Sequence, residues 1–530
     1  MTAGPGTRRT HQIRLLTVIF SVSVLLSSCS VGPSQRPPLA TFGGTANDAP
    51  TSTSTSSPPL GPGGPGQQAD PIRWSACGDV DSLDRASGLS FDVDCGEVQV
   101  DRSTNGGFGA QRVQVARARV ADLPQDAPAV VVLDGQPGEN GRSRVAAVAA
   151  GLSSAVRQHF AVITVDLMGS GGSEPIDCLS NRDAGTLTSL GVDPTEPAAA
   201  TALADLSRSL TFECGDVAGA ELSLVNSTLA ADDLDALRSA LGSGTLTLIG
   251  RGFGATLGAV YADRYPGRVG AAVLDAPADP LEAPDVRMAE VAVSAERSLD
   301  TFAAQCPTFS GGCPLGADPR AQIDKAVATL DAVPGSFPGS GSTNGGSVLL
   351  ALLLRLGDPT GWPELATALA AAAAGNGQPI DDLLRDSLGL SGQSEWLGAA
   401  IIYACNDAVL RISPDQLAAA VDKVRAEAPL LGPYALGLVA VCSSWPAPEN
   451  ALGTVKATGA APILLTAAVD DPVAPYASVQ SLAGQLGSAR LISWQSGQHG
   501  SYPGSSCITA AVDNYLLQGE LPAIGSLCPP

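Results

Sequence analysis

The chain has 530 residues, of which 44% are hydrophobic and only 15% are charged, and its formal net charge is −22 at pH 7. This composition excludes a disordered or coiled-coil protein, and the length suits a large core domain with an insertion. The acidic balance argues against nucleic acid as a partner and against a basic membrane-binding surface.

The first 28 residues are typical of an export signal. Three arginines precede an apolar run from Leu15 to Leu26, which is too short to span a membrane comfortably. The run ends in Leu26-Ser-Ser-Cys29, which resembles a bacterial lipobox, so residues 1–28 are predicted to be removed and Cys29 to carry the lipid. An ordinary signal peptide with an incidental cysteine is the alternative. We therefore expect an exported protein on the outer face of the cell membrane, or shed from it, whose membrane contact is the lipid anchor alone.

Residues 29–70 are rich in Pro, Ser, Thr and Gly. Such a segment cannot bury enough apolar surface to fold, so it is predicted to be a flexible tether between the lipid and the folded domain. A second Gly/Ser-rich stretch, residues 334–347, is predicted to be a surface loop.

The cysteine count agrees with export. There are 11 cysteines, and ten remain once Cys29 is assigned to the lipid. An even number in an exported protein indicates disulfides. With three histidines and no Cys-x-x-Cys motif, the sequence argues against a zinc site, and neither a metal nor a cofactor is expected.

From Trp74 onward the pattern becomes globular. Val98–Val100 and Val113–Val120 alternate as antiparallel strands do. Continuous apolar runs, typical of buried parallel strands, occur at Ala129–Leu133, Ala161–Val165, Leu246–Ile249, Val269–Leu274, Pro462–Thr466 and Leu491–Trp494. Helices are expected at Leu229–Leu241, Ala255–Tyr265 and Ile508–Leu517, and helical patterns dominate from Leu281 to about Ala440.

This alternation of strands and helices, interrupted by one long helical block, predicts the α/β class. The expected architecture is a doubly wound, mostly parallel sheet with an inserted helical cap. Its first core part is expected at residues 71–280, the cap at 281–445 and the C-terminal core part at 446–530.

The most informative motif lies at residues 246–255, Leu-Thr-Leu-Ile-Gly-Arg-Gly-Phe-Gly-Ala. A buried strand runs into a Gly-rich turn and then into a helix. The spacing is not that of a dinucleotide-binding loop, and no strand ending in an acid follows at the required distance. The motif matches instead the nucleophile elbow Gly-x-Ser-x-Gly, with Gly252 in place of the central serine. A turn this sharp is expected to leave no room for side chains at positions 250 and 254, where the sequence has Gly250 and Gly254.

Two backbone N–H groups are candidates for an oxyanion hole. In hydrolases with such an elbow, the loop after an early strand supplies one donor and the residue after the nucleophile supplies the other. Here the loop is Gly135-Gln-Pro-Gly138, so the candidates are Gln136 and Phe253. Most Gly/Pro loops of this kind are simple turns, which is the alternative interpretation.

An acid and a base follow in the chain order of such hydrolases. Asp471 comes directly after a buried strand, where the acid of a triad would lie, although surface Asp-Pro turns are common. His499 follows the last strand and is the candidate general base. The other histidines are poorer candidates, since His11 lies in the signal peptide and His159 precedes a buried strand.

From about Trp74 to Cys528 the sequence resembles the tripeptidyl-aminopeptidase-like α/β-hydrolases of actinobacteria, which are relatives of the proline iminopeptidases. The landmarks are Trp74 and Cys77, Gly135–Gly138 for the family's GGPG, Asp166–Ser173 for D-x-x-G-x-G-x-S, Val273–Pro280, Cys405, Cys442–Trp445, Asp471–Pro475 for DPVTP, His499-Gly500 and Cys507 with Cys528.

This resemblance implies an α/β-hydrolase fold with Asp471 as the triad acid and His499 as the base. It also implies a peptide or acyl compound as the ligand of the cap pocket. With the pairing of neighbouring cysteines, it implies the disulfides Cys77–Cys95, Cys178–Cys214, Cys306–Cys313, Cys405–Cys442 and Cys507–Cys528. The sequence departs from the family at Gly252, where serine is expected, and at Gln136, where glycine is expected.

Glycine cannot form an acyl-enzyme, so Gly252 argues against ordinary serine hydrolase activity. Three interpretations remain. The chain is a degenerate hydrolase that binds an envelope peptide or lipid, or an active peptidase or esterase with an unorthodox mechanism, such as water activated by His499 and Asp471. The third is a non-catalytic scaffold of the cell envelope.

Overall fold

The computed structural model describes residues 69–102, 109–133, 135–336, 342–390, 396–449 and 451–530. The expected signal peptide, the lipidation site at Cys29 and nearly all of the tether lie outside the described residues.

The described residues form a ten-stranded, mostly parallel sheet at the core. Its strands, in spatial order, are β1 (Ser75–Ala76), β4 (Asp92–Asp101), β5 (Ala110–Arg119), β7 (Ala161–Val165), β6 (Ala129–Leu133), β8 (Leu246–Arg251), β9 (Val269–Asp275), β12 (Ile463–Ala468), β13 (Ala489–Trp494) and β14 (Leu527–Cys528). The pairs from β1 to β7 are antiparallel, and every pair from β7 to β14 is parallel. The doubly wound α/β sheet expected from the sequence is therefore confirmed.

Helices cover both faces of this sheet, which explains why its central strands are apolar without alternation. One face packs against α1 (Val145–Ala150), α2 (Ser154–His159) and α16 (Ser506–Gln518). The other packs against α5 (Ser227–Ala240), α6 (Phe253–Arg264) and α15 (Tyr476–Gln485). In β8, for example, Leu248 joins the second layer and its neighbour Ile249 the first, and both are fully buried.

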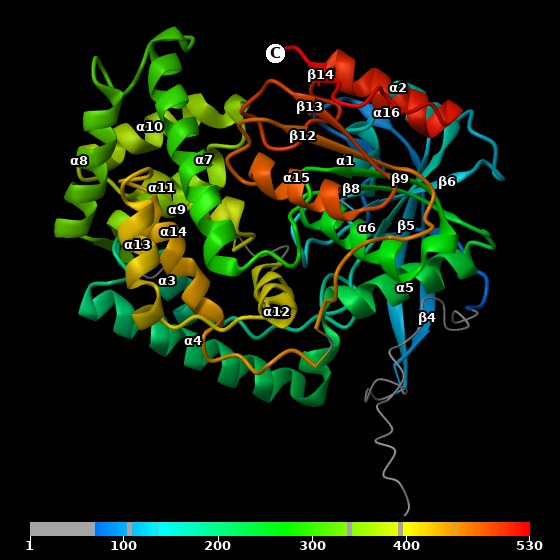
Figure 1. Ribbon diagram of the computed structural model, residues 1–530, viewed down its shortest axis with the longest axis horizontal. Helices are drawn as coiled ribbons and strands as arrows, with labels where there is room; N and C mark the ends of the chain where they lie inside the picture. The colour runs from blue at the N-terminus through cyan, green and yellow to red at the C-terminus, as the bar shows by residue number, and fades with distance from the viewer. Residues whose placement is uncertain (1–68, 103–108, 134, 337–341, 391–395, 450) are drawn as a thin grey trace, which may run out of the picture. The chain divides into compact units, whose positions relative to one another are not determined.

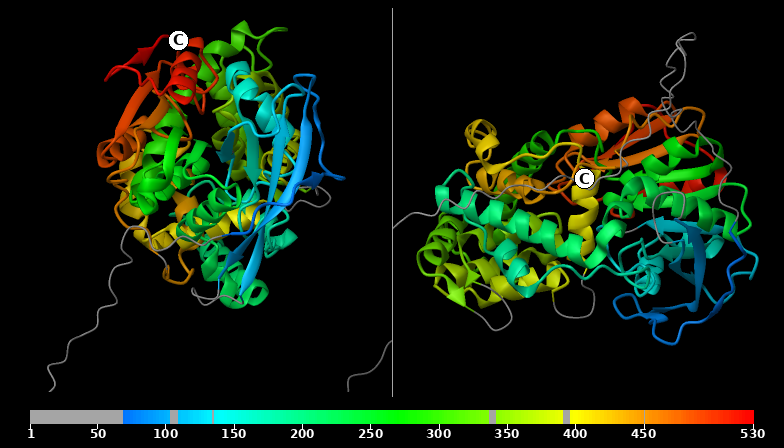
Figure 2. Two further views of the ribbon diagram at one scale, coloured as in Figure 1. Left: turned by 90° about the vertical axis from the view of Figure 1, so that its right-hand side faces the viewer. Right: turned by 90° about the horizontal axis from the view of Figure 1, so that it is seen from below.

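A block of helices lies beside the sheet, on the left in Figure 1. It contains α7 (Pro284–Gln305), α8 (Pro319–Ala332), α9 (Gly345–Arg355), α10 (Trp362–Ala373), α11 (Gln378–Ser387), α12 (Leu397–Asp407), α13 (Ala418–Val424) and α14 (Gly432–Leu438). Two earlier helices, α3 (Asn181–Thr188) and α4 (Pro197–Ala218), pack against it through α9 and the short turn η7 (Val439–Cys442). Figure 2, seen from below, shows α4 running along this block. This helical block corresponds to the expected cap, and two separate stretches of the chain contribute to it.

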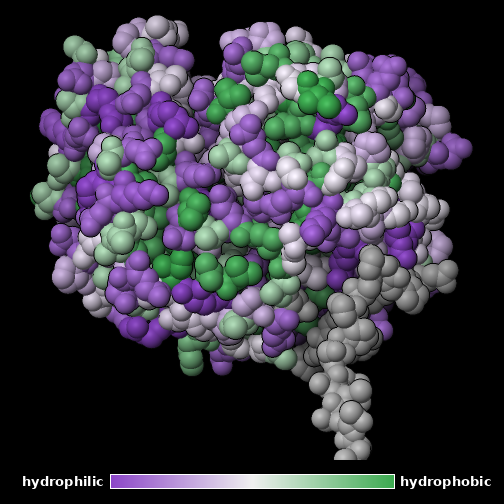
Figure 3. All heavy atoms as spheres, viewed as in Figure 1, coloured by the Kyte–Doolittle hydropathy of each residue, from purple (hydrophilic) through white to green (hydrophobic). Residues whose placement is uncertain are grey.

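Short elements complete the fold. They are the hairpins β2 (Leu83–Asp84) with β3 (Leu89–Ser90) and β10 (Gly335–Ser336) with β11 (Ser342–Thr343), and the 3₁₀ turns η2 (Gly219–Leu224), η3 (Pro266–Arg268), η4 (Cys306–Thr308), η5 (Pro359–Gly361) and η6 (Pro414–Gln416). The face in Figure 3 is mostly hydrophilic, with small separate groups of hydrophobic residues.

The five disulfides expected from the sequence are confirmed in the described part of the chain. They join Cys77 to Cys95, Cys178 to Cys214, Cys306 to Cys313, Cys405 to Cys442 and Cys507 to Cys528. No helix in that part is long and apolar enough to cross a membrane.

Candidate active site

A sharp turn joins β8 to α6 at the position of the expected elbow. β8 ends at Arg251, α6 begins at Phe253, and Gly252 between them has φ +51° and ψ −117°, a conformation that costs other residues about 1–3 kcal/mol. The glycines on either side of Gly252 are needed because a larger residue would clash with the backbone. A Cβ on Gly250 would lie 2.4 Å from the carbonyl oxygen of Gly254, and one on Gly254 would lie 2.0 Å from that of Leu133.

Gly252 itself has room for a side chain. A Cβ built on its backbone would lie 3.5 Å from Nε2 of His499, an ordinary van der Waals distance. Apart from its two chain neighbours, no other residue that the structure describes comes within 4 Å of this position. The elbow therefore has the space and the direction for a side chain that would face the imidazole.

The structure brings Asp471 and His499 together as an acid–base pair. Nδ1 of His499 lies 2.9 Å from one carboxylate oxygen of Asp471 and 3.1 Å from the other. The backbone N–H groups of Val473, Ala474 and Gly500 also donate to this carboxylate, at 2.8, 2.9 and 3.2 Å, and its side chain is 1% exposed. Because Nδ1–H donates to Asp471, Nε2 of the neutral ring keeps its lone pair for the space at Gly252.

The electrostatics favour the protonated imidazole. Burial lowers the pKa of His499, but the negative charge and hydrogen bond of Asp471, with a smaller contribution from Asp275, more than offset it. The pKa of His499 therefore lies above its ordinary value. Such a ring takes up a proton readily, as a general base must.

Asp275 is a structural residue of this site that the sequence analysis missed. It ends β9, is fully buried, and its backbone carbonyl accepts a hydrogen bond from Gly252 N–H at 2.9 Å. Its carboxylate accepts hydrogen bonds from Thr466 Oγ1 at 2.6 Å, from the N–H and Oγ of Ser501 at 2.9 and 2.6 Å, and from the N–H of Tyr502 at 3.1 Å. Asp275 thus fixes the loop that carries His499. An acid at the end of an otherwise apolar strand was the available signal.

The residues that carry the two candidate oxyanion donors are neighbours in space. Gln136 and Phe253 line the same small pocket, together with Gly138. No described residue accepts a hydrogen bond from the backbone N–H of Gln136 or Phe253. Both groups are therefore available to an oxygen atom of a ligand, and the N–H of Phe253 is also at the positive end of α6.

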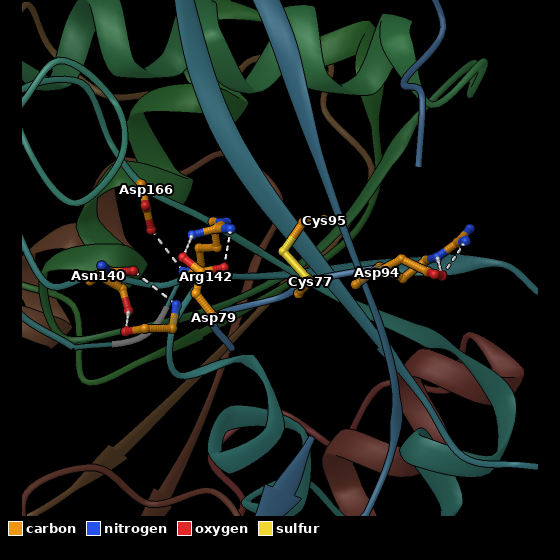
Figure 4. Close-up of a disulfide and its surroundings, with 9 residues drawn as sticks. Cys77, Asp79, Asp94, Cys95, Asn140, Arg142 and Asp166 are labelled. Atoms are coloured by element: carbon orange, nitrogen blue, oxygen red, sulfur yellow. Dashed lines mark hydrogen bonds and ion pairs between the residues drawn. A yellow bond between two sulfur atoms is a disulfide. The ribbon is translucent and has the colours of Figure 1, made fainter. Parts of the chain in front are cut away.

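A buried carboxylate also anchors the loop that follows Gly138. Asp166, at the end of β7, accepts hydrogen bonds from the N–H of Arg142 at 2.7 Å and of Gly172 at 2.8 Å. The guanidinium of Arg142 pairs with Asp79 at 2.7 Å, close to the Cys77–Cys95 disulfide (Figure 4). Burial raises the pKa of Asp166, and its N–H donors only partly offset this effect.

The cap touches the loop of Gln136 at Gly138 and the side chain of Phe253. A Cβ on Gly138 would lie 2.5 Å from the carbonyl oxygen of Trp396 and 2.7 Å from Cβ of Ala399, so α12 packs directly on the oxyanion loop. Tyr403, also on α12, packs edge-on against the ring of Phe253 with ring centroids 5.4 Å apart.

The remaining sequence candidates lie elsewhere. His159 ends α2 and packs edge-on against its neighbour Phe160. His11 is outside the described residues. Within the described ranges, no group of three or more His, Cys, Asp or Glu side chains is arranged to hold a metal ion.

Several known proteins are similar in sequence to this chain. Residues 428–528 match the family described as TAP-like protein. Serine protease Hip1 of Mycobacterium tuberculosis is 26% identical over 485 residues, covering 86% of this chain and 91% of that protein. The resemblance to the tripeptidyl-aminopeptidase-like α/β-hydrolases expected from the sequence is therefore confirmed.

Other similar proteins are also named as esterases or peptidases. Carboxylesterase B of Mycobacterium tuberculosis is 27% identical over 441 residues, covering 80% of this chain and 84% of that protein. Tripeptidyl aminopeptidase of Streptomyces lividans is 23% identical over 452 residues, covering 83% and 84% of the two chains. A solved structure, proline iminopeptidase of Mycobacterium smegmatis, matches with 15% identity and a TM-score of 0.36 over 80% of this chain and 98% of the other.

Proposed function

We propose that this tripeptidyl-aminopeptidase-like protein is a degenerate hydrolase of the cell envelope, which binds a peptide or an acyl compound without forming an acyl-enzyme. The observation that carries the proposal is Gly252 at the elbow. Removing the serine of a protease triad costs about 10⁶ in kcat and leaves roughly 10³–10⁴ over the uncatalysed rate. Binding by the rest of the site does not require that serine.

Two neighbouring hydroxyl groups do not replace the missing nucleophile. Oγ1 of Thr256 donates to the carbonyl oxygen of Ala278 at 3.2 Å and accepts from its N–H at 3.0 Å. Oγ of Ser501 donates to the carboxylate of Asp275 at 2.6 Å. Both hydroxyls are engaged with the protein itself, and neither is held by His499.

The retained groups suit recognition of a carbonyl or carboxylate oxygen. The unbonded N–H groups of Gln136 and Phe253 and the imidazole of His499, whose pKa is raised, are all donors for such an oxygen. A groove of about 600 Å³ lies beside the loop that carries Asp471. Its lining mixes apolar and charged side chains, which supports a peptide as the ligand. Val286, Glu290, Val424, Pro475 and Tyr476 are among its lining residues.

The cellular setting is part of the same proposal. Five disulfides are typical of exported proteins. The sequence around Cys29 adds a lipid anchor on the outer face of the membrane.

A second candidate is hydrolysis by a water molecule placed at Gly252. The 3.5 Å between the Cβ position and Nε2 of His499 favours it, since a water in this space would meet the base directly.

Turnover of ester and tripeptide amide substrates by the wild type and by His499→Gln separates the two functions. The degenerate hydrolase gives equal, near-background rates in both proteins, with saturable binding of a tripeptide to the wild type. A wild-type rate that falls to background in His499→Gln contradicts this proposal, and it supports the water mechanism if the wild type does not react with a serine-directed fluorophosphonate.

A further inference from the structure

One residue of the cap touches the loop of His499 directly. Gly357 follows α9, is buried, and its carbonyl oxygen accepts a hydrogen bond of 2.8 Å from the backbone N–H of His499. A Cβ on Gly357 would lie 2.9 Å from Cβ of His499 and 3.1 Å from Cγ2 of Val473. Gly357 therefore contacts the loop of the base and the loop of Asp471 at once.

Space, and not backbone conformation, makes glycine necessary here. Gly357 does not have a positive φ, so alanine can adopt its backbone conformation. The methyl group of alanine would nevertheless require His499 or Val473 to move by some tenths of an ångström.

The core of the cap holds this turn in place. The carbonyl oxygen of Leu356, which is fully buried, accepts hydrogen bonds from Nε1 of Trp362 at 3.2 Å and from Oγ of Ser298 at 3.4 Å. The Trp362 ring is 3% exposed and packs edge-on against Phe302 of α7, with ring centroids 5.5 Å apart. The turn before Gly357 is thus tied to α7 and α10, and its position follows theirs.

We propose that Gly357 is a positioning residue through which the cap holds His499 in line with Asp471 and with the space at Gly252. The inference goes beyond the proposed function, because it concerns the geometry of the imidazole and holds whether or not the protein turns over a substrate.

The test is an NMR titration of the His499 ring in the full chain labelled at histidine, with His499→Gln to assign the signal. In Gly357→Ala we expect the ring signals to shift and the pKa of His499 to fall toward the ordinary histidine value, because its contact with Asp471 is loosened. Gly361→Ala is the matched control. Gly361 lies in the same segment with φ −85°, and its Cβ would lie 3.4 Å from the nearest atom, a carboxylate oxygen of Asp358.

If Gly357→Ala folds and His499 titrates as in the wild type, the proposal is overturned. If this variant does not fold, His499 is titrated in Trp362→Phe instead. This substitution removes the hydrogen bond to Leu356 and keeps an aromatic ring in the cap core. The proposal then requires a smaller change of His499 in the same direction, and an unchanged titration overturns it.

Discussion

Gly252 faces His499 across a space that a side chain would fill: the Cβ position of the elbow residue lies 3.5 Å from Nε2 of the imidazole. The other partner of the ring, Asp471, is in place at 2.9 Å from Nδ1. The geometry around the elbow therefore leaves space for a side chain that would face the imidazole. A site that had decayed throughout would not keep a buried aspartate aligned with an imidazole.

The first prediction concerns the glycines of the elbow. Gly254→Ala is expected to destabilise the protein strongly, because its Cβ would lie 2.0 Å from the carbonyl oxygen of Leu133 and the backbone must move. Gly252→Ala is expected to cost only about 1–3 kcal/mol, since its cost is the positive φ and not a clash. Urea unfolding of both variants measures the difference. Equal losses would contradict the elbow geometry.

The second prediction concerns pH. Because the pKa of His499 is raised in the folded protein, protonation of this ring stabilises the fold. The contribution is complete below the unfolded value of about 6.5 and is lost as the pH rises through the folded pKa. The difference in unfolding free energy between the wild type and His499→Gln should therefore be largest near about pH 5 and shrink toward about pH 9. A difference that does not depend on pH would refute the aligned pair.

The third prediction concerns Asp275. Replacing it by alanine leaves the donors of Thr466, Ser501 and Tyr502 buried without an acceptor, and each such group costs roughly 1–3 kcal/mol. We expect a large loss of stability and a changed environment of the His499 ring. Asp470→Ala is the control, since Asp470 directly precedes Asp471 and its carboxylate makes no comparable set of hydrogen bonds with the described residues. Thermal unfolding and the histidine NMR signal give both readings.

The sequence predicted the parts of the site that depend on local pattern. The elbow, the acid and the base each follow a buried strand, and parallel strands bring their carboxyl ends to one edge of a sheet, so Gly252, Asp471 and His499 could be expected to meet. The five disulfides followed from the resemblance and from the pairing of neighbouring cysteines.

The contribution of the cap could not be predicted in the same way. Gly357 has no motif, and its contact with His499 depends on how α9 and α10 pack, which is set by many weak contacts over long sequence separations. Likewise, α3 and α4 join the cap through packing on α9 and η7, and amphipathic pattern alone does not reveal a helix's partner. Asp275 was missed because its one signal, an acid at the end of an apolar strand, does not say which groups that acid will bond.

The fourth prediction concerns the N-terminus. If residues 1–28 are removed and Cys29 is lipidated, the mature protein partitions into the detergent phase of a Triton X-114 extraction. Cys29→Ala should abolish this partitioning. Cys29→Ala that still partitions into detergent, or a mature N-terminus that maps elsewhere, would contradict the anchor and leave a plain signal peptide.

The last prediction restores the missing group. The wild type is expected not to react with a serine-directed fluorophosphonate, because the elbow has no hydroxyl. In Gly252→Ser, the new Oγ extends from a Cβ that lies 3.5 Å from Nε2 of His499, and the N–H groups of Gln136 and Phe253 are unbonded. A base and two oxyanion donors are then in place, so labelling and esterase turnover should appear together.

Two controls make this prediction specific. His499→Gln in the Gly252→Ser background should abolish both labelling and turnover, because the serine loses its base. Gly252→Ala should show neither, although it carries the same backbone strain of about 1–3 kcal/mol. Strong labelling of the wild type would show that another serine serves as the nucleophile and would end the interpretation as a degenerate hydrolase. A well-folded Gly252→Ser that neither labels nor turns over would mean that the aligned His499 and Asp471 are not sufficient for catalysis, and the scaffold interpretation would then be favoured.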